Sequence, residues 1–406
     1  MQTKLSADIL STPQGQAADR ILRACVHCGF CTATCPTYQL LGDELDSPRG
    51  RIYLIKQMLE GNAVTAKTQT HLDRCLTCRS CETTCPSGVQ YGKLIDIGRE
   101  LVEHRVSRGV FDYIKRLMLR KIVPYPARFK ALVTLGSLAK PLLPASLKRK
   151  LPALPARAAR PVQQHARTML IAEGCAQSVS TPATNDATAR ILDKLGIQLI
   201  SAPNSGCCGA VSQHLAAPAE ALDFVRRNID AWWPYVAQGA EAIISTASGC
   251  GVMLKDYGDL LQHDLQYAER AKRISAITRD VAEVLAGEDL SPLQIQPARI
   301  KVAFHCPCTL QHGQKLTGKT EALLQKLGFE LTAVSDSHLC CGSAGTYSVL
   351  QPELSQQLLA NKVAALQQGK PDIIVTANVG CQMHLASQAN VAVKHWVELL
   401  DVRSQA

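Results

Sequence analysis

The sequence predicts a multidomain α+β protein in which a mainly helical N-terminal domain precedes a duplicated α/β region. Two observations lead to this prediction. Two copies of the spacing C-x2-C-x2-C-x3-C-P lie fifty residues apart near the N-terminus, among segments whose apolar residues have helical spacing. Further along, segments typical of strands alternate with segments typical of helices, and a set of four cysteines occurs twice. At 406 residues the chain is long enough for two or three domains.

Each N-terminal cysteine run has the spacing of a bacterial ferredoxin, in which three thiolates bind one 4Fe-4S cluster and the fourth binds the neighbouring cluster. The proline that ends each run turns the chain, so the fourth thiolate points away from its own loop. Zinc usually takes two separated pairs of ligands, and disulfide frameworks are typical of short secreted chains, so both alternatives fit less well. We therefore predict two 4Fe-4S clusters, with Cys25, Cys28, Cys31 and Cys85 binding cluster 1 and Cys75, Cys78, Cys81 and Cys35 binding cluster 2.

The predicted N-terminal domain spans residues 1–103 and contains three helical patterns. Residues 15–24 lead into the first cysteine run, and residues 94–106 follow the second. Residues 47–61 begin with Ser47 and Pro48, a favourable cap and first-turn pair. A helix between the runs makes the domain similar to the all-helical ferredoxin domain of succinate dehydrogenase and heterodisulfide reductase subunits. Arg49 and Arg51 of this helix are either solvated or close to the negatively charged clusters.

The cysteine content indicates a reducing environment. The chain has 17 cysteines, and residues 1–20 lack the basic start and apolar region of a secretory signal. Metal ligands in the cytoplasm are therefore expected rather than disulfides. No stretch approaches the roughly 18 apolar residues that a membrane helix requires, so we do not expect the chain to span a membrane.

Residues 104–167 form a basic, proline-containing linker. This segment has fifteen Lys or Arg against one acid, Asp112, an excess of +14 when the whole chain carries +10. Its prolines predict short helices and extended pieces. The linker either docks on an acidic partner subunit, docks on anionic lipid headgroups, or is simply solvated. Nucleic-acid binding is not expected, because no recognised motif accompanies the charge.

From residue 168 onward, strands and helices alternate and predict mainly parallel sheets in two lobes, residues 168–290 and 291–406. A helix is predicted over 187–196. The predicted strands lie within residues 168–175, 197–202, 241–250, 301–308, 329–334 and 372–381.

The two lobes carry matching cysteines at offsets of 133, 133, 133 and 131 residues. Cys175, Cys207, Cys208 and Cys250 of the first lobe correspond to Cys308, Cys340, Cys341 and Cys381 of the second. These Cys-Cys-Gly (CCG) repeats resemble the B subunit of heterodisulfide reductase. That family has a Cys-x2-Cys at the end of each repeat, whereas Ala247 and Asn378 replace its first cysteine here, so its noncubane clusters cannot be carried over unchanged.

Two interpretations of the CCG cysteines remain open, an additional iron-sulfur cluster or inert core thiols. The second lobe is the stronger candidate for a third centre because it adds Cys306 and His305, while the first lobe is a weaker one. Three further histidines lie nearby in the sequence, although a single histidine is more often a hydrogen-bonding residue than a ligand. They are His312, His338 and His384.

Over its full length the chain resembles the iron-sulfur subunits of bacterial glycolate oxidase, a membrane-associated glycolate dehydrogenase. The resemblance rests on residues 21–57, 71–88, 227–234, 246–251, 304–312 and 336–347. It implies that an FAD-containing partner subunit oxidises glycolate and D-lactate, and that this chain relays the electrons towards quinone or another membrane acceptor. The expected location is the cytoplasmic face of the inner membrane, in peripheral association.

The residues agree with this division of labour. The sequence has no G-x-G-x-x-G loop after a strand and no nucleophile elbow, so we assign no catalytic residues and no substrate oxidation to this chain alone. Other interpretations are a CCG subunit of a heterodisulfide-reductase-like complex, a subunit of anaerobic glycerol-3-phosphate dehydrogenase or of lactate utilisation, and a nonenzymatic scaffold for cluster assembly.

Overall fold

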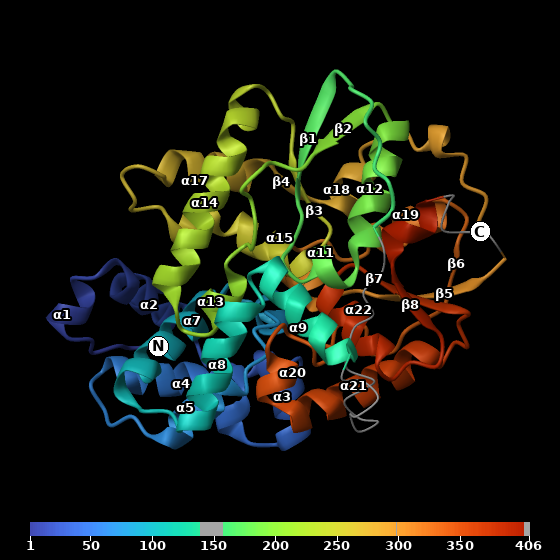
Figure 1. Cartoon of the computed structure of the whole chain (residues 1–406). Helices are drawn as coiled ribbons and strands as arrows, with labels where there is room; N and C mark the ends of the chain where they lie inside the picture. The colour runs from blue at the N-terminus through green and yellow to red at the C-terminus, as the bar shows by residue number, and fades with distance from the viewer. Residues whose placement is uncertain (139–156, 298, 402–406) are drawn as a thin grey trace.

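The computed structural model describes residues 1–138, 157–297 and 299–401 of the chain (Figure 1). The N-terminal part is helical, as predicted, and the three predicted helices are confirmed as α2, α4 and α7. Thr12 and Ser47 cap α2 and α4 by accepting hydrogen bonds from backbone amides, and each helix then begins with a proline. The helices are α1 (Ala7–Leu10), α2 (Pro13–Ala24), α3 (Pro36–Leu41), α4 (Pro48–Leu59), α5 (Ala66–Asp73), α6 (Ser80–Thr84) and α7 (Tyr91–Arg105), with short 3-10 turns η1 (Phe30–Thr32) and η2 (Glu44–Asp46).

The core of the N-terminal domain lies where α2, α4 and α7 pack together. Leu22, Ile55 and Leu94 are fully buried there. Gly98 allows α7 to approach α4 closely, because a Cβ atom at this position would lie 2.6 Å from Ile55 Cγ1. The helices thereby hold the two cysteine loops at fixed positions.

Two helices occupy the predicted basic linker, α8 (Val110–Ile122) and α9 (Pro126–Leu138). The linker's stretch 139–156 lies outside the described residues. Much of the linker's charge is paired within the chain: Arg108 and Arg116 both bind Asp73, and Lys121 binds Glu220. This intramolecular pairing was not among the interpretations of the linker's charge, and it anchors α8 to both the N-terminal domain and the first lobe.

The remainder forms two α/β lobes, each with a four-stranded parallel sheet of the same strand order (Figure 1). The orders are β2-β1-β3-β4 and β6-β5-β7-β8. The first sheet contains β1 (Arg167–Ala172), β2 (Ile197–Ile200), β3 (Ile243–Ser245) and β4 (Thr278–Asp280); the second contains β5 (Lys301–His305), β6 (Glu330–Leu331), β7 (Ile373–Thr376) and β8 (Ala392–His395). All six predicted strands are confirmed, whereas β4 and β8 were not predicted.

The helices of the two lobes are also arranged in matching order. The predicted helix over 187–196 is confirmed as α12, which begins earlier, at Pro182. The first lobe contains α11 (Gln177–Ser180), α12 (Pro182–Lys194), α13 (Ala210–His214), α14 (Pro218–Ala237), α15 (Ser248–Lys255), α16 (Tyr257–Leu260), α17 (Ala268–Ile277) and α18 (Val281–Leu285). The second contains α19 (Lys319–Lys326), α20 (Tyr347–Leu350), α21 (Pro352–Gln367) and α22 (Val379–Ala386), with the turns η4 (Ser291–Leu293), η5 (Thr309–Gly313) and η6 (Trp396–Leu400).

The lobes share one hydrophobic core, and the N-terminal domain packs against both of them. Ile244 of the first sheet and Trp396 of the second lobe belong to the same buried cluster. Arg79 pairs with Asp256 of the first lobe at 2.7 Å, while Tyr347 Oη of the second lobe donates to the Arg74 carbonyl at 3.1 Å. The domain boundaries stay a prediction. Within the described ranges, no helix is both long and apolar enough to cross a membrane.

Candidate metal centres

The two N-terminal cysteine loops have the same unusual backbone conformation. In both loops φ is positive at the residues on either side of the second cysteine: 55° at His27 and 87° at Gly29 in the first, 53° at Thr77 and 58° at Arg79 in the second. A positive φ costs a residue other than glycine about 1–3 kcal/mol and persists where the surroundings enforce it, often at functional sites. The curled backbone brings amides to sulfur, and Thr77 N donates to Cys75 Sγ at 3.4 Å.

The structure places the four predicted cluster 1 cysteines around one small cavity. Cys25, Cys28, Cys31 and Cys85 all line it, together with Cys81. Burial raises the pKa of Cys25, and Cys85 and Cys28 are among the charged neighbours that raise it further. Cys28 is exposed, so this group of thiols reaches the protein surface.

The predicted cluster 2 cysteines form a second, deeper group. Burial raises the pKa of Cys81 well above its usual value, and Cys78, Cys75 and Cys35 raise it further. Cys35 therefore lies with the second run, although it belongs to the first run in sequence. The structure brings together both sets of four that the spacing predicts, while metal ligation by them stays a prediction.

Two buried arginines, Arg51 and Arg99, lie beside the cluster 2 thiols. The Arg51 side chain is 1% exposed, contacts Asp46 at 3.3 Å and donates to the His71 carbonyl at 2.7 Å. Although burial lowers it, the pKa of Arg51 is raised overall by Tyr91, Cys75 and Cys35. Arg51 is thus beside the thiols.

Arg99 is the second buried arginine, and Arg49 is a more exposed one. Arg49 lies nearer the surface and pairs with Glu44 at 2.8 Å. Arg99, which sequence reasoning missed, donates to the Cys75 carbonyl at 2.5 Å. Nothing in the local sequence around Arg99 distinguishes it from a surface arginine of α7.

The four cysteines of each lobe form a continuous chain of thiol contacts. In the first lobe, the thiol of Cys207 neighbours those of Cys175 and Cys208, and the thiol of Cys208 neighbours that of Cys250. The second lobe repeats this order: the Sγ atoms of Cys308 and Cys340 lie 3.8 Å apart, and the thiol of Cys341 neighbours those of Cys340 and Cys381. Three of the first four and all of the second four are buried.

The structure explains why glycine follows the two cysteines in each Cys-Cys-Gly sequence. Gly209 and Gly342 have φ of 93° and 86°, and each amide donates to the first thiol of the pair, at 3.5 and 3.4 Å. A Cβ atom on Gly342 would lie 2.6 Å from the Ser355 carbonyl oxygen. Only glycine therefore allows the loop to pass close to the following helix while presenting its thiols.

Of the other candidate metal ligands in the second lobe, some lie beside the thiols and others do not. Cys306 lies in the apolar core shared by the two lobes. His312 has structural partners, Thr83 Oγ1 at 2.8 Å and the His338 carbonyl at 3.0 Å. His305, in contrast, lies beside Cys341 and Cys381.

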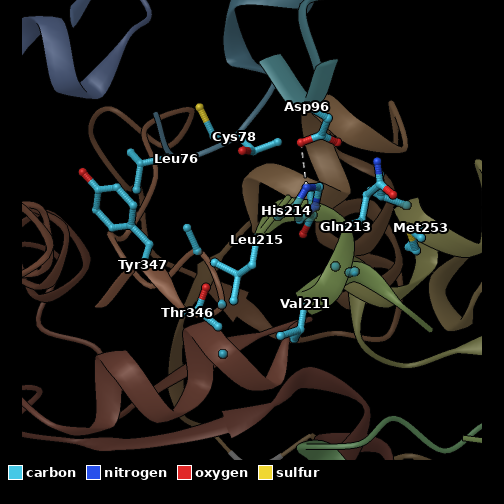
Figure 2. Close-up of a pocket in the computed structure, with 18 of the residues that line it drawn as sticks. Leu76, Cys78, Asp96, Val211, Gln213, His214, Leu215, Met253, Thr346 and Tyr347 are labelled. Carbon is cyan, nitrogen blue, oxygen red and sulfur yellow. Dashed lines mark hydrogen bonds and ion pairs between the residues drawn. The ribbon is translucent and has the colours of Figure 1, made fainter. Parts of the chain in front are cut away.

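One large cavity joins the cluster 2 thiols to both lobes. Its volume is about 1420 Å³, and nine cysteines line it: Cys75, Cys78, Cys175, Cys207, Cys208, Cys250, Cys308, Cys340 and Cys381. Apolar side chains such as Leu76, Leu215 and Tyr347 point into the same region (Figure 2). His214 Nδ1 and Asp96 Oδ1 are hydrogen-bonded there, at 3.1 Å (Figure 2).

Comparison with known families agrees with this arrangement. Residues 21–89 match the 4Fe-4S dicluster domain, and residues 169–255 and 302–386 match the cysteine-rich domain. The chain is 57% identical over 402 residues to the glycolate oxidase iron-sulfur subunit of Escherichia coli K12, an alignment that covers 99% of this chain and 98% of that protein. This chain belongs to the glycolate oxidase iron-sulfur subunit family.

More distant relatives in the comparison have related names. The probable glycolate oxidase iron-sulfur subunit of Bacillus subtilis is 29% identical, with 89% of this chain and 87% of that protein covered. Lactate utilization protein A of Bacillus velezensis is 28% identical, with 53% of this chain and 92% of that protein covered. As a member of the glycolate oxidase iron-sulfur subunit family, the chain is an electron-transfer subunit of an oxidoreductase complex, with 4Fe-4S clusters as cofactors and at least one partner subunit.

Proposed function

We propose that the chain takes electrons one at a time from an FAD-containing subunit that oxidises glycolate and D-lactate, and passes them towards quinone at the cytoplasmic face of the inner membrane. The observation that carries the proposal is the spatial order of the thiol groups, which runs from the surface of the protein to its interior. The first group includes the exposed Cys28, whereas three of the second group, Cys35, Cys75 and Cys81, are buried and Cys78 is half-buried. After burial, the strongest neighbour that raises the pKa of Cys78 is Cys308 of the second lobe.

The side chains around the thiols fit iron-sulfur clusters. On the proposed assignment, four thiolates bind each cluster, and when bound the clusters supply one-electron oxidation and reduction. The guanidinium groups of Arg51 and Arg99 place positive charge beside the second group, where it offsets the negative charge of thiolates. The Tyr91 hydroxyl donates to Cys75 Sγ at 3.5 Å, a type of hydrogen bond that adjusts cluster potentials.

The flavoprotein docks, on this proposal, over the first cysteine loop. Val26 and Phe30 flank Cys28 and are 66% and 60% exposed. Exposed apolar side chains around a redox centre are suited to a protein interface. A partner seated there would bring its flavin close to the first thiol group.

The membrane side of the proposal rests on α8 and α9. These helices expose several large apolar side chains and carry the cations Lys115, Arg128 and Lys130. The exposed apolar residues are Val110, Phe111, Tyr113, Ile114, Met118, Leu132, Leu135 and Leu138. A helix surface that combines apolar side chains with cations fits the interface of an anionic bilayer.

The same helices border the large cavity. Ile114, Met118 and Leu132 line it as well as being exposed. A quinone that leaves the bilayer at α8 and α9 would therefore enter an apolar space that also reaches Cys78. The imidazole of His214, hydrogen-bonded to Asp96, lies in this space and would transfer protons to the reduced quinone.

Cysteine substitutions test the relay. Cys28→Ser and Cys78→Ser should each abolish electron flow from glycolate to an artificial quinone while leaving flavin reduction in the partner subunit intact. Cys306→Ala, which changes a buried thiol in the apolar core, is the matched control and should retain electron flow. Turnover through the complex that survives both serine substitutions would overturn the relay.

Lactate utilisation is a second candidate, because relatives with that name match half of the chain. The partner subunit would determine which substrate is oxidised, because we assign no substrate-oxidising residues to this chain. Flavin reduction in the purified complex separates the two, because reduction by lactate but not by glycolate would favour lactate utilisation.

A further inference from the structure

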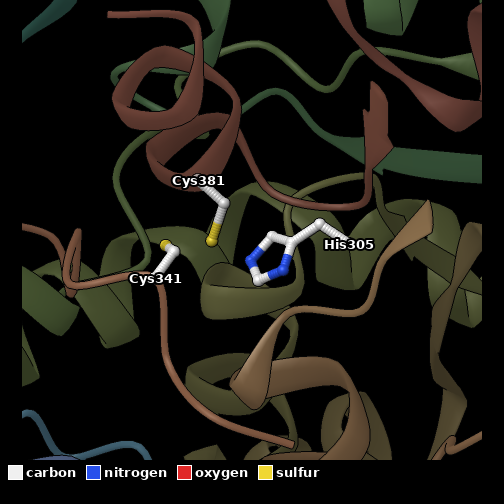
Figure 3. A group of neighbouring side chains, drawn as sticks. All are labelled: His305, Cys341 and Cys381. Carbon is white, nitrogen blue, oxygen red and sulfur yellow. The ribbon is translucent and has the colours of Figure 1, made fainter. Parts of the chain in front are cut away.

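His305, Cys341 and Cys381 converge in the interior of the second lobe (Figure 3). One donor atom from each side chain lies within 4.8 Å of the others. The residues are 2%, 1% and 5% exposed. They come from three separate elements, the last position of β5, the Cys-Cys-Gly loop and the first turn of α22, so the fold rather than local sequence brings them together.

The imidazole of His305 lacks the hydrogen bond that a buried ring nitrogen normally makes. Among the described residues, its Nε2 has no hydrogen-bond partner, and the ring points towards the two thiols (Figure 3). Leaving such a group unsatisfied costs about 1–3 kcal/mol. His395, the last residue of β8 in the same sheet, is equally buried but has its Nε2 2.8 Å from the Thr246 carbonyl oxygen. The missing hydrogen bond is therefore specific to His305 and is not shared by the other buried histidine of the same sheet.

The first lobe lacks this nitrogen donor. Ala172 ends β1 as His305 ends β5, and it stands 133 residues earlier, the same offset as the repeated cysteines. Ala247 precedes α15 where Asn378 precedes α22, and Asn378 Nδ2 donates to Cys381 Sγ at 3.4 Å. The two thiol sets are equivalent, but only the second has polar side chains directed at them from these two positions.

We infer that His305, Cys341 and Cys381, with Cys340 next in the chain of thiols, bind iron in a third iron-sulfur centre that has one imidazole ligand. Three thiolates and one imidazole form a donor set that suits iron or zinc, and the choice of iron rests on the proposed electron relay. Cys340 and Cys308 lie against Cys78 and Leu76, so the centre adjoins the cluster 2 thiols. The first lobe, with alanine at both corresponding positions, has no equivalent nitrogen ligand.

The test uses the full chain purified anaerobically after growth with ¹⁵N-labelled histidine. Iron and acid-labile sulfide are counted, zinc is measured, and pulsed EPR detects nitrogen coupled to a reduced cluster. We expect iron above the roughly eight atoms of two 4Fe-4S clusters, together with histidine nitrogen coupling. His305→Ala should lose the coupling and the extra iron, whereas His395→Ala, the matched buried histidine, should keep both.

A second variant separates ligation from folding. His305→Cys restores a donor, so it should recover the extra iron without nitrogen coupling, even if His305→Ala folds poorly. A wild-type chain with about eight irons only, zinc as the only additional metal, or nitrogen coupling that persists in His305→Ala would each overturn the inference. Fewer than eight irons would instead count against the two N-terminal clusters, so failure of this inference is distinguishable from failure of the proposed relay.

Discussion

Substitution of the glycine in the second Cys-Cys-Gly loop tests whether backbone geometry holds this loop in place. Gly342 has φ of 86°, and an added Cβ atom would meet the Ser355 carbonyl oxygen at 2.6 Å. Alanine in the left-handed region costs about 1–2 kcal/mol, and the overpacking adds about 1–3 kcal/mol. Gly318 is the matched control, because its φ is 75° and no heavy atom lies within 4 Å of the added Cβ. Gly318→Ala should therefore be destabilised only by the backbone cost of alanine at a positive φ.

Urea unfolding monitored by tryptophan fluorescence measures the difference. Trp396 is fully buried in the core that both lobes share, so its emission reports on the fold around the loop. We expect Gly342→Ala to lower the free energy of unfolding by about 1–3 kcal/mol more than Gly318→Ala. Gly209→Ala should fall between them, because its Cβ would approach the Ala221 carbonyl oxygen only to 3.0 Å. If Gly342→Ala were as stable as Gly318→Ala, the steric reason for this glycine would be refuted.

Three further predictions concern charge and surface. Asp46→Asn should cost about 3–5 kcal/mol in urea unfolding, because it leaves the buried guanidinium of Arg51 without its carboxylate; a loss below about 1 kcal/mol would contradict this role. Burial raises the pKa of Asp280 to about 7, so the native state keeps a proton that the unfolded chain releases near pH 4, and stability should fall as pH rises from about 4 to 7. Asp280→Asn cannot ionise and should remove that part of the pH dependence; equal slopes of stability against pH in both proteins would count against it. Phe111, 84% exposed on α8, should contribute to vesicle binding, so Phe111→Asp should weaken binding to anionic vesicles about tenfold in a sedimentation assay, whereas Phe30→Asp should leave it unchanged.

The parts of the fold that the sequence predicted are those with short-range physical causes. The cysteine spacing led to the crossed grouping of Cys35 with the second run, and the pair Ser47-Pro48 located the start of α4. The strands β4 and β8 were missed because Thr278–Asp280 and Ala392–His395 are short and contain charged residues. Their places at equivalent edges of the two sheets depend on pairing with β3 and β7, which no local pattern indicates.

The buried charges could not be predicted for a related reason. Arg51 reads as one of several basic residues at the start of a helix, and Asp46 and His71, which stabilise it, come from a turn and another helix. The position of His305 was partly predictable. Its place beside Cys306 and Cys308 in the sequence makes it a candidate donor, and Ala172, which stands at the repeat offset, shows that the histidine is specific to the second lobe.

The crossed arrangement of the N-terminal cysteines has a consequence for assembly. On the proposed assignment, Cys35 joins the second loop's cluster and Cys85 joins the first, so neither loop completes a site alone. Arg51 ties this crossing to the core, since it binds Thr37, two residues after Cys35, and the carbonyl of His71, just before the second run. Because α4 also packs against α7, which follows the second run, the helices must be in place before the fourth ligand of either cluster is in position. The helical core is thus a condition for both clusters, and the two sites should form together rather than one after the other.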